Sequence, residues 1–443
     1  MRFVIVGGGA DGSHLAERLI AEGEDVAVVE ADPARVSLLR ERLDAQIVDG
    51  NGASPSVLRR AGVERADILF AVSDNDGANV LACQSALSLG CKRTVARIEN
   101  PELRDVILGS GIEAIIDPRA TLAEKLVALV ANPGLSDYFR FEHGAAVVLG
   151  GNVPPDSGIA GMSLAEMRRS LDDWDCVIAS IVRDDQTLVG RGSTVIEAFD
   201  KILLVVAGEN VDRARRLIGA PPQRIDRAVI VGGGRVAELT AAALRSAGWR
   251  VLLIHDVEER ALAIAARNPK IDVVVADATD PRILQSLEIG RGDGVLALTR
   301  SDAVNMLVCM MASRLSASTT VSRFNRIELF DLMPAVGVNA GVSAKVAAAN
   351  AALRFIRRGA IVSAANFMTG GIEALEIEVY EPAPAIGVSV GELGVPKGAV
   401  VGAIVREGKA VVPRGSTRFL SGDRVIVLAT PEAVGVVERL FGA

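Results

Sequence analysis

A glycine cluster near the start of the chain has the spacing of a phosphate-binding loop. Gly7, Gly9 and Gly12 follow an apolar run at residues 3–6 and precede apolar residues at helical spacing. The first glycine allows a tight turn, the second lets the backbone approach a pyrophosphate, and the third lets the helix pack on the strand. The N–H groups at the start of the helix would then face the phosphates. The other members of the loop are Gly8, Ala10 and Asp11.

An acidic residue stands where a ribose acceptor is expected. Glu30 ends the second apolar run, which follows the helical segment after Gly12. Its carboxylate can accept hydrogen bonds from both hydroxyls of an adenosine ribose, and it would repel a 2′-phosphate. We therefore predict a site for NAD⁺ or NADH rather than NADP, with ATP or ADP as further candidates. The alternative is a glycine-rich turn that only packs a sheet.

Polar residues follow the later apolar runs of the same segment. Asn51 follows the third run, Ser73 and Asp74 follow the fourth, and Arg97 follows the fifth. Ligands of open parallel sheets bind outside the carboxyl ends of the strands, so these side chains could contact adenine or phosphate. Turn or helix-cap roles are equally good explanations for the first three. A structural salt bridge is an equally good explanation for Arg97.

A second glycine cluster departs from this pattern. Its members are Gly232, Gly233, Gly234, Arg235 and Val236, and Ala237 replaces the third glycine. His255 occupies the position of Glu30, and we align Arg235 with Asp11, which adds positive charge beside the loop. The second site is expected to bind a nucleotide more weakly, to bind one of different charge, or to bind none.

The chain is an internal duplication. Gly7 corresponds to Gly232, and the identities continue at an almost constant offset through five further pairs: Asp67/Asp293, Asp76/Asp302, Asn79/Asn305, Cys83/Cys309 and Arg97/Arg323. The tetrapeptide at 191–194 recurs at 414–417. The predicted domains are 1–132, 133–221, 222–358 and 359–443.

The pattern of strands and helices that must position these residues predicts an α/β fold. In the first domain, short apolar runs alternate with helical patterns, which predicts a Rossmann-like parallel sheet with helices on both faces. The domain that follows has short strands around one helix and is expected to be a small α+β domain. The second half repeats both.

Composition excludes several functions. The 443 residues are 50% hydrophobic and 3% aromatic, and the net charge is −7, which is a poor basis for nucleic-acid binding. Four cysteines and three histidines show neither a disulfide framework nor metal-ligand spacing. We see no catalytic constellation, so we expect neither an enzyme nor a metal site. No apolar run is long enough for a membrane span, and the first strand starts at residue 3, so we expect a cytoplasmic protein without a signal peptide.

These motifs resemble the TrkA family, whose members carry tandem RCK domains, each a Rossmann-like lobe followed by a small lobe. The resemblance rests on residues 7–12 with Glu30, and on the segments 49–51, 71–79 and 96–101. It also rests on the repeated Arg-Gly-Ser-Thr blocks, and it covers essentially the whole chain.

The resemblance implies a cytoplasmic regulatory subunit, peripheral on the inner face of the membrane, that binds NAD⁺, NADH, ATP or ADP. It also implies a homo-oligomeric ring, commonly a tetramer, that gates a separate TrkH- or TrkG-like potassium-translocating subunit. The rival hypotheses are an NAD-dependent dehydrogenase and a nucleotide sensor without a membrane partner.

Two apolar segments at 122–130 and 346–356 bear on assembly. Leu122, Leu126, Leu129 and Val130 form one helical stripe. The stripe either packs on its own domain or belongs to a crossover helix that packs on a neighbouring unit. We expect the second arrangement, so that a charged residue at Leu126 would disrupt pairing.

Overall fold

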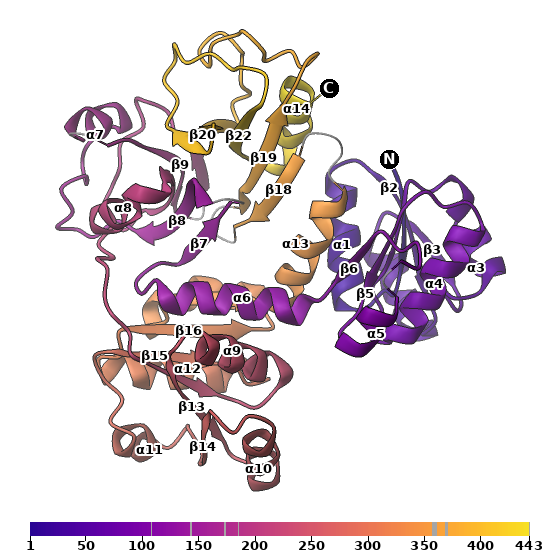
Figure 1. Cartoon of the computed structure of the whole chain (residues 1–443), viewed down its shortest axis with the longest axis horizontal. Helices are drawn as coiled ribbons and strands as arrows, with labels where there is room; N and C mark the ends of the chain where they lie inside the picture. Colours follow the sequence, from indigo (N-terminus) through magenta and orange to yellow (C-terminus); the bar gives the residue numbers. More distant parts are fainter. Residues whose placement is uncertain are drawn as a thin grey trace. The chain divides into compact units, whose positions relative to one another are not determined.

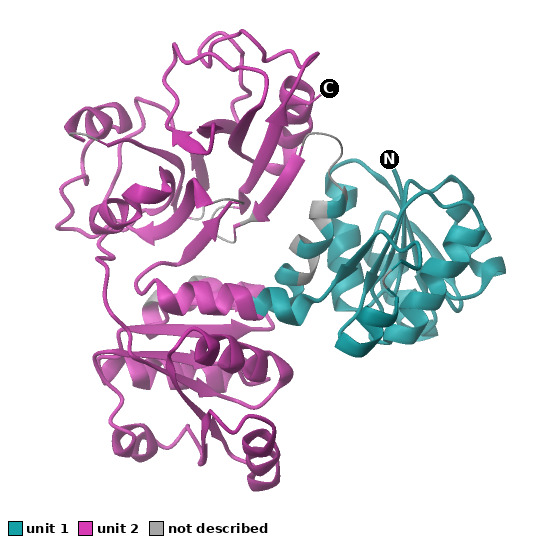
Figure 2. Cartoon of the chain, in the orientation of Figure 1, with its two compact units in different colours: residues 1–122, 343–358 teal, residues 123–342, 359–443 magenta. Residues whose placement is uncertain are grey.

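The structure is a computed structural model that describes residues 1–107, 109–141, 144–171, 174–184, 186–356, 361–367 and 371–442. The predicted joint at 358–359 lies outside these residues. The chain forms two compact units (Figure 2). The first contains residues 1–122 with 343–358, and the second contains residues 123–342 with 359–443.

The first unit is built on a six-stranded sheet of order β3-β2-β1-β4-β5-β6, and all of its pairings are parallel (Figure 1). Its strands are β1 Arg2–Val6, β2 Asp25–Glu30, β3 Gln46–Asp49, β4 Ile68–Ala71, β5 Thr94–Arg97 and β6 Ala114–Ile116. The helices between them are α1 Ala10–Ala21, α2 Pro33–Arg42, α3 Pro55–Arg60, α4 Asp76–Ser88 and α5 Pro101–Val106, and α6 Pro118–Ala131 follows.

The continuous apolar strands are explained by burial on both faces of this sheet. Val4 and Val6 of β1 belong to a core on one face, whereas Phe3 and Ile5 belong to a core on the other face. All four side chains are at most 6% exposed. A strand with two buried faces needs apolar residues at every position rather than alternate ones.

The second unit contains the duplicate sheet, of order β14-β13-β12-β15-β16-β17. Its strands are β12 Arg227–Val231, β13 Arg250–His255, β14 Asp272–Val275, β15 Asp293–Ala297, β16 Thr319–Phe324 and β17 Ala340–Ser343. Its helices are α9 Arg235–Ser246, α10 Glu258–Arg267, α11 Pro281–Ser286 and α12 Asp302–Arg314. Helix α13 Ala344–Ile356 follows β17 in the sequence but belongs to the first unit. The predicted pair of Rossmann-like sheets is thus confirmed.

Two small lobes complete the second unit, with antiparallel sheets of order β10-β9-β11-β8-β7 and β18-β19-β22-β20-β21. The first small lobe contains β7 Asp137–Arg140, β8 Ala146–Asn152, α7 Leu164–Ser170, β9 Cys176–Arg183, β10 Gln186–Val189, β11 Lys201–Ala207 and α8 Val211–Leu217. The second contains β18 Ile361–Asn366, β19 Glu373–Val379, β20 Ala399–Arg406, β21 Lys409–Val411, β22 Asp423–Ala429 and α14 Pro431–Phe441.

The two small lobes share one apolar core. Val205 of β11 and Ala403 of β20 are both buried in it. The rings of Phe139 and Phe367 meet edge to face with their centroids 6.3 Å apart. A Cβ on Gly402 would come within 2.6 Å of Val205, so the sheets approach too closely there for any larger residue.

The helices that follow the parallel sheets are exchanged between the halves of the sequence. Ala351 and Ala352 of α13 belong to the core of the first sheet, and α13 lies beside α1 (Figure 1). Arg93 donates a 2.8 Å hydrogen bond to the carbonyl of Phe355. In the second unit, Val130 of α6 lies against Gly294 of β15, where an added Cβ would come within 2.3 Å of it. The expected crossover helices are present, and they pair the halves within one chain.

The residues that recur between the halves hold the ends of the strands in place. The Asn79 amide accepts from both the N–H and the hydroxyl of Ser73, and it donates to the carbonyl of Arg97 at 2.9 Å. Asn305 makes the same set of bonds with Thr299 and Arg323. Both asparagines are fully buried, so the repeated pattern records structural requirements.

Candidate functional site

The first glycine loop is held tightly at three of its four glycines. Gly7 has a φ of +101°, and a Cβ on it would lie 2.8 Å from the backbone nitrogen of Ser73. A Cβ on Gly8 would come within 2.4 Å of Leu39, and one on Gly12 within 1.8 Å of the Gly7 carbonyl oxygen. These three glycines are therefore required for the fold itself.

Gly9 is the exception, because the space in front of it is open. Its φ is −66°, which any residue adopts, and the nearest atom to an added Cβ is a guanidinium nitrogen of Arg35 at 3.7 Å. The absence of a side chain here leaves room for a ligand rather than for a neighbour in the chain.

The N-terminus of α1 meets this open space without a capping side chain. Three other helices of this sheet are capped, because Asp32, Asn75 and Asn100 each accept a backbone N–H at the start of α2, α4 and α5, whereas the short α3 has no side-chain cap. The exposed N–H groups and the dipole of α1 therefore make its N-terminus a suitable anion site.

Glu30 is buried beneath the loop with only 7% of its surface exposed. One carboxylate oxygen accepts the Gly8 N–H at 2.7 Å, and the other accepts the N–H groups of Ala31 and Asp32 at 2.9 Å each. A carboxylate has about four lone-pair sites, so about one remains for a ribose hydroxyl. Glu30 thus shapes the loop, and its ribose role stays a prediction.

The strand-end residues have different environments. The Ser73 hydroxyl donates to Asn79 at 2.7 Å, as expected for a turn residue, while its backbone lies against Gly7. Asn51 accepts the N–H of Ala53 at 2.9 Å, which closes a turn. Asp74 is exposed at the end of β4.

Arg97 belongs to an ion cluster rather than to the glycine loop. Its guanidinium donates to Asp11 at 2.7 Å and to Glu99, and Arg119 contacts the same Glu99 at 2.5 Å. Burial raises the pKa of Asp11, against the opposing effect of Arg97. Because two carboxylates already neutralise Arg97, the geometry favours the salt-bridge explanation.

The sequence reasoning missed one cation next to the loop. Arg35, in the first turn of α2, reaches the space over Gly9 with a half-exposed side chain, and Asp32 lies 3.6 Å from it. The duplication could have pointed to Arg35, because Arg260 is at the equivalent position of the second half. A basic residue near the glycine loop and the start of the helix can bind phosphate.

The second glycine loop has the same backbone conformation as the first at its leading glycine, but its side chains differ in charge and hydrogen bonding. Gly232 has a φ of +115°, and Gly234 has nothing within 4 Å of an added Cβ. The helix starts at Arg235, as α1 starts at Ala10, so Arg235 corresponds to Ala10 and Val236 to Asp11. The predicted match of Arg235 with Asp11 is therefore wrong by one position. Arg235 is exposed and Val236 is buried.

His255 packs under this loop where Glu30 packs under the first. A Cβ on Gly233 would lie 2.2 Å from the imidazole Cδ2 and 2.9 Å from Nε2. Nδ1 accepts the Val257 N–H at 2.9 Å, so in the neutral ring the hydrogen is on Nε2. The second loop thus presents a hydrogen-bond donor where the first presents an acceptor.

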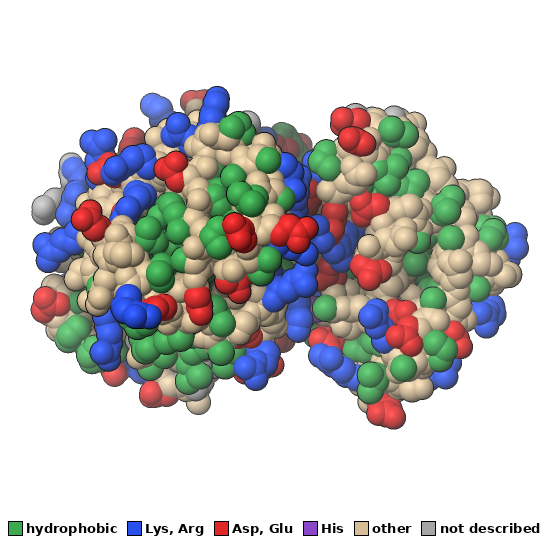
Figure 3. Space-filling model, turned by 90° about the horizontal axis from the view of Figure 1, so that it is seen from below, with side chains coloured by type: hydrophobic (Ala, Val, Ile, Leu, Met, Phe, Trp, Pro, Cys, Tyr) green, Lys and Arg blue, Asp and Glu red, His purple; other side chains and the backbone are tan. Residues whose placement is uncertain are grey.

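Within the described part of the chain, no group of three or more His, Cys, Asp or Glu residues could hold a metal ion. The described helices include none that is long and apolar enough to cross a membrane. Basic and acidic side chains are interspersed with hydrophobic ones over the face in Figure 3.

Two Rossmann-like sheets with glycine loops, each followed in the sequence by a small antiparallel lobe, define the class of proteins with tandem RCK domains. A family model of the TrkA-N domain matches residues 3–118 and 228–344, and one of the TrkA-C domain matches residues 152–219 and 374–442. The chain belongs to the TrkA family.

Curated relatives match over the full length. A Trk system potassium uptake protein TrkA homolog of Archaeoglobus fulgidus is 33% identical over 100% of both chains. TrkA of Azorhizobium caulinodans is 31% identical over 100% of this chain and 98% of the relative. Among solved structures, the GsuK RCK domain has a TM-score of 0.60 at 20% identity, covering 99% of this chain and 94% of that one. The GsuK channel bound to NAD has the same TM-score at 19% identity, covering 99% and 78%.

Proposed function

We propose that this protein is a nucleotide-binding regulatory subunit that gates a membrane potassium-uptake transporter. The observation that supports this most directly is the uncapped N-terminus of α1 over an open Gly9, with Glu30 buried beside it. The family supplies the physiological setting, because its curated relatives are named as potassium uptake proteins.

The effector of the first half is proposed to be NAD⁺ or NADH, with ATP or ADP competing for the same loop. The phosphates would lie over residues 7–10 at the start of α1, near Arg35, and the ribose would bond to Glu30. Asn51, Ser73 and Asp74 would line the far side of the site. A related fold has been solved with NAD bound, in the GsuK channel, which agrees with this assignment.

The second half is proposed to hold a nucleotide mainly through its phosphates. Nε2–H of His255 donates rather than accepts, and Arg235 and Arg260 are exposed near the start of α9 and in α10. Donors and cations suit phosphate oxygens better than they suit a pair of ribose hydroxyls. ATP should therefore bind here more tightly than NADH.

The partner is proposed to be a TrkH- or TrkG-like potassium-translocating subunit, reached from the cytoplasmic face of the membrane. The protein itself would act as a homo-oligomeric ring, a tetramer of chains divided into domains at residues 132, 221 and 358. A nucleotide that binds two ring shapes unequally would shift their populations and pass that difference to the pore.

Calorimetry on one glycine variant tests the ligand site. Gly9→Val fills open space without meeting the chain, so NADH binding to the first half should be lost while the melting temperature is unchanged. Gly415→Val is the matched control, because Gly415 also has open space and no positive φ. Normal NADH binding by a folded Gly9→Val variant would show that the loop is only a packing turn.

The rival functions are separated by transport and turnover assays. Potassium flux through vesicles that contain the translocating subunit should depend on this protein and on nucleotide, and should lose the NADH effect with Gly9→Val. We propose no catalytic role. Steady oxidation of NADH by small carbonyl substrates would favour a dehydrogenase, and absence of any flux effect would favour a sensor without a membrane partner.

A further inference from the structure

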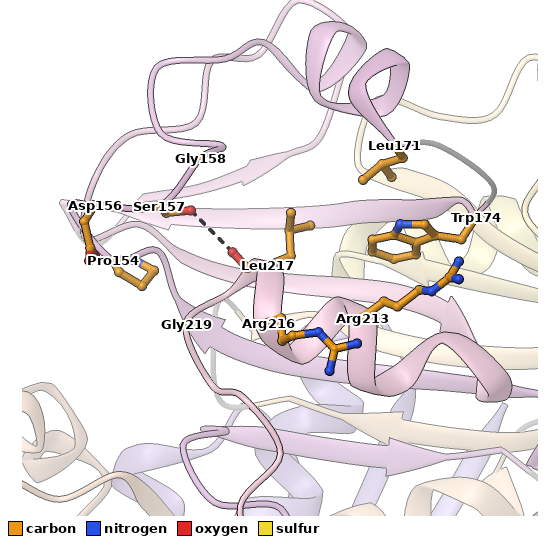
Figure 4. Close-up of a pocket in the computed structure, with 10 residues that line it drawn as sticks. All are labelled: Pro154, Asp156, Ser157, Gly158, Leu171, Trp174, Arg213, Arg216, Leu217 and Gly219. Carbon is orange, nitrogen blue, oxygen red and sulfur yellow. Dashed lines mark hydrogen bonds between the residues drawn. The ribbon is translucent and has the colours of Figure 1, made fainter.

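A pocket lies within the first small lobe, well away in sequence from both glycine loops. It has a volume of about 660 Å³ and lies between the 154–158 loop, the start of β9 and helix α8 (Figure 4). Pockets of roughly 300–1,000 Å³ are the usual size for small ligands. The lining side chains that matter chemically are Trp174, Arg213, Arg216, Leu171 and Leu217.

The pocket joins a flat aromatic wall to a cationic one. Trp174 is partly buried and packs against the core of the lobe, so its indole is held in place. Arg213 extends from α8 toward that indole (Figure 4). Arg216, also on α8, lines the pocket and is exposed, and Asp156 is the one acidic side chain among the described lining residues. A fixed indole stacks on flat rings, and guanidinium groups bind phosphate.

The duplicate lobe shows that the fold does not require Trp174 or Arg213. The scaffold recurs: Arg183 bonds to Asp200 as Arg406 bonds to Asp423 in the second small lobe. The buried face of the helix recurs as well, since Ala214 and Val437 are both fully buried.

Two side chains of the pocket change between the lobes, whereas Arg216 recurs as Arg439. In the register that pairs Arg183 with Arg406, Trp174 is replaced by Lys397 and Arg213 by Val436. The aromatic wall of Trp174 is therefore specific to the first small lobe and is not needed by the shared scaffold.

We propose that this pocket binds a small aromatic phosphate, with its ring on Trp174 and its phosphate at Arg216. The site would be a second effector site, distinct from the glycine loops and present in only one of the two small lobes. Its position on α8, which leads into the second half, suits an input to the regulatory function.

Tryptophan fluorescence tests this directly in the full chain. The chain has two tryptophans, so Trp249→Phe leaves Trp174 as the only indole. Adenosine 5′-monophosphate should quench its emission saturably. Adenosine, which lacks the phosphate, and ribose 5-phosphate, which lacks the ring, should each bind at least about tenfold more weakly.

Paired arginine variants complete the test. Arg216→Gln should weaken the response to adenosine 5′-monophosphate at least about tenfold, whereas Arg439→Gln, the corresponding change in the second small lobe, should leave it unchanged. No saturable quenching, an equal response to adenosine, or no effect of Arg216→Gln would overturn the proposal. Loss of quenching in a Gly9→Val, Gly234→Val double variant would also overturn it, because the glycine loops would then be the source.

Discussion

At the scale of single residues, the buried carboxylate of Glu30 links ligand binding to stability. It accepts three backbone N–H groups beneath the first loop. Removing an acceptor from buried donors costs about 1–3 kcal/mol. Glu30→Ala should therefore lower the free energy of unfolding by that order, in addition to weakening NADH and ATP binding.

Urea denaturation and calorimetry would separate the two effects of Glu30→Ala. The loss of charge-assisted bonds to ribose should weaken NADH binding by about 1.5–3 kcal/mol, which is roughly tenfold to more than a hundredfold. Unchanged affinity for both nucleotides in a folded variant would rule out the ribose role. Glu24→Ala is a suitable control, because Glu24 lies at the opposite end of β2, where it pairs with the N-terminal amine.

Neighbouring glycines of the loop should respond in opposite ways to the same change. A Cβ on Gly8 would lie 2.4 Å from Leu39 and 3.1 Å from Glu30, whereas one on Gly9 meets nothing closer than 3.7 Å. Gly8→Ala should destabilise the first unit by about 1–3 kcal/mol through overpacking, and Gly9→Ala should stay within about 0.5 kcal/mol of the parent. Equal unfolding midpoints for the two variants would contradict this geometry.

The cysteines should be inert in the folded protein. Cys83, Cys91, Cys176 and Cys309 are all buried, and burial raises the pKa of Cys83, Cys176 and Cys309 to about 12. At pH 8 the thiolate fraction of these three is of order one in ten thousand, and the thiolate is the reactive form. Ellman's reagent should therefore modify no cysteine until denaturant is added. Rapid modification of a native thiol would contradict the buried positions.

At the scale of elements, the sequence predicted the strands better than the partners of side chains. Periodicity and the repeat located the parallel strands, because strands buried on both faces leave continuous apolar runs. The helical segment expected after Gly12 in fact starts at Ala10, since the glycine loop gives no apolar signal for the first turn of the helix. The pairing of Arg97 with the distant Asp11 has no local signature, because it follows only from the tertiary fold, which brings the start of α1 to the end of β5.

Because the helices are exchanged, a substitution in the second half of the sequence should destabilise the sheet formed by the first half. Ala352 is 2% exposed in the core of the first sheet, beside a small cavity that Asp11, Leu15 and Arg97 also line. Ala352→Asp places a second carboxylate there and should destabilise the first unit by more than about 2 kcal/mol. Hydrogen exchange should then show faster exchange in strands β1 and β6, although the substitution lies in the other half of the sequence.

The same experiment has a clear opposing outcome. If protection is lost only within α13 and the first sheet keeps its parent exchange rates, the helix does not support that sheet. Ala242→Asp is a suitable control, since Ala242 is exposed on α9, a helix of the other parallel sheet.

At the scale of the whole molecule, pairing within the chain changes where a ring interface must be sought. Leu126 is fully buried in a single chain, so a charged residue there would damage the chain itself rather than separate one chain from another. The exchanged helices and the shared core of the small lobes are likewise buried within a single chain. Contacts between chains must therefore use surfaces that remain exposed.

The duplication identifies such surfaces. Leu81 on α4 is 60% exposed, and Leu307, its counterpart on α12, is 36% exposed. Val106 and Leu332 are another such pair, at 78% and 48%. Exposed apolar residues at equivalent places in both halves suit an interface that repeats around a closed ring, because each half would present the same patch to its neighbour.

We predict that Leu81→Glu breaks the proposed tetramer into smaller species without unfolding the chain. The substituted side chain is already in solvent in the isolated chain, so its cost should appear only when a neighbouring chain covers it. Light scattering at micromolar concentration should give a tetramer for the parent and a lower mass for the variant, with equal melting temperatures in dilute solution. Leu262→Glu is the matched control: Leu262 is 62% exposed, but position 37 in the other half is a serine, so it lacks a repeated partner. If the Leu81→Glu variant remains a tetramer, the interface lies elsewhere. If the parent chain is monomeric with and without nucleotide, both the ring and the gating mechanism that depends on it are ruled out.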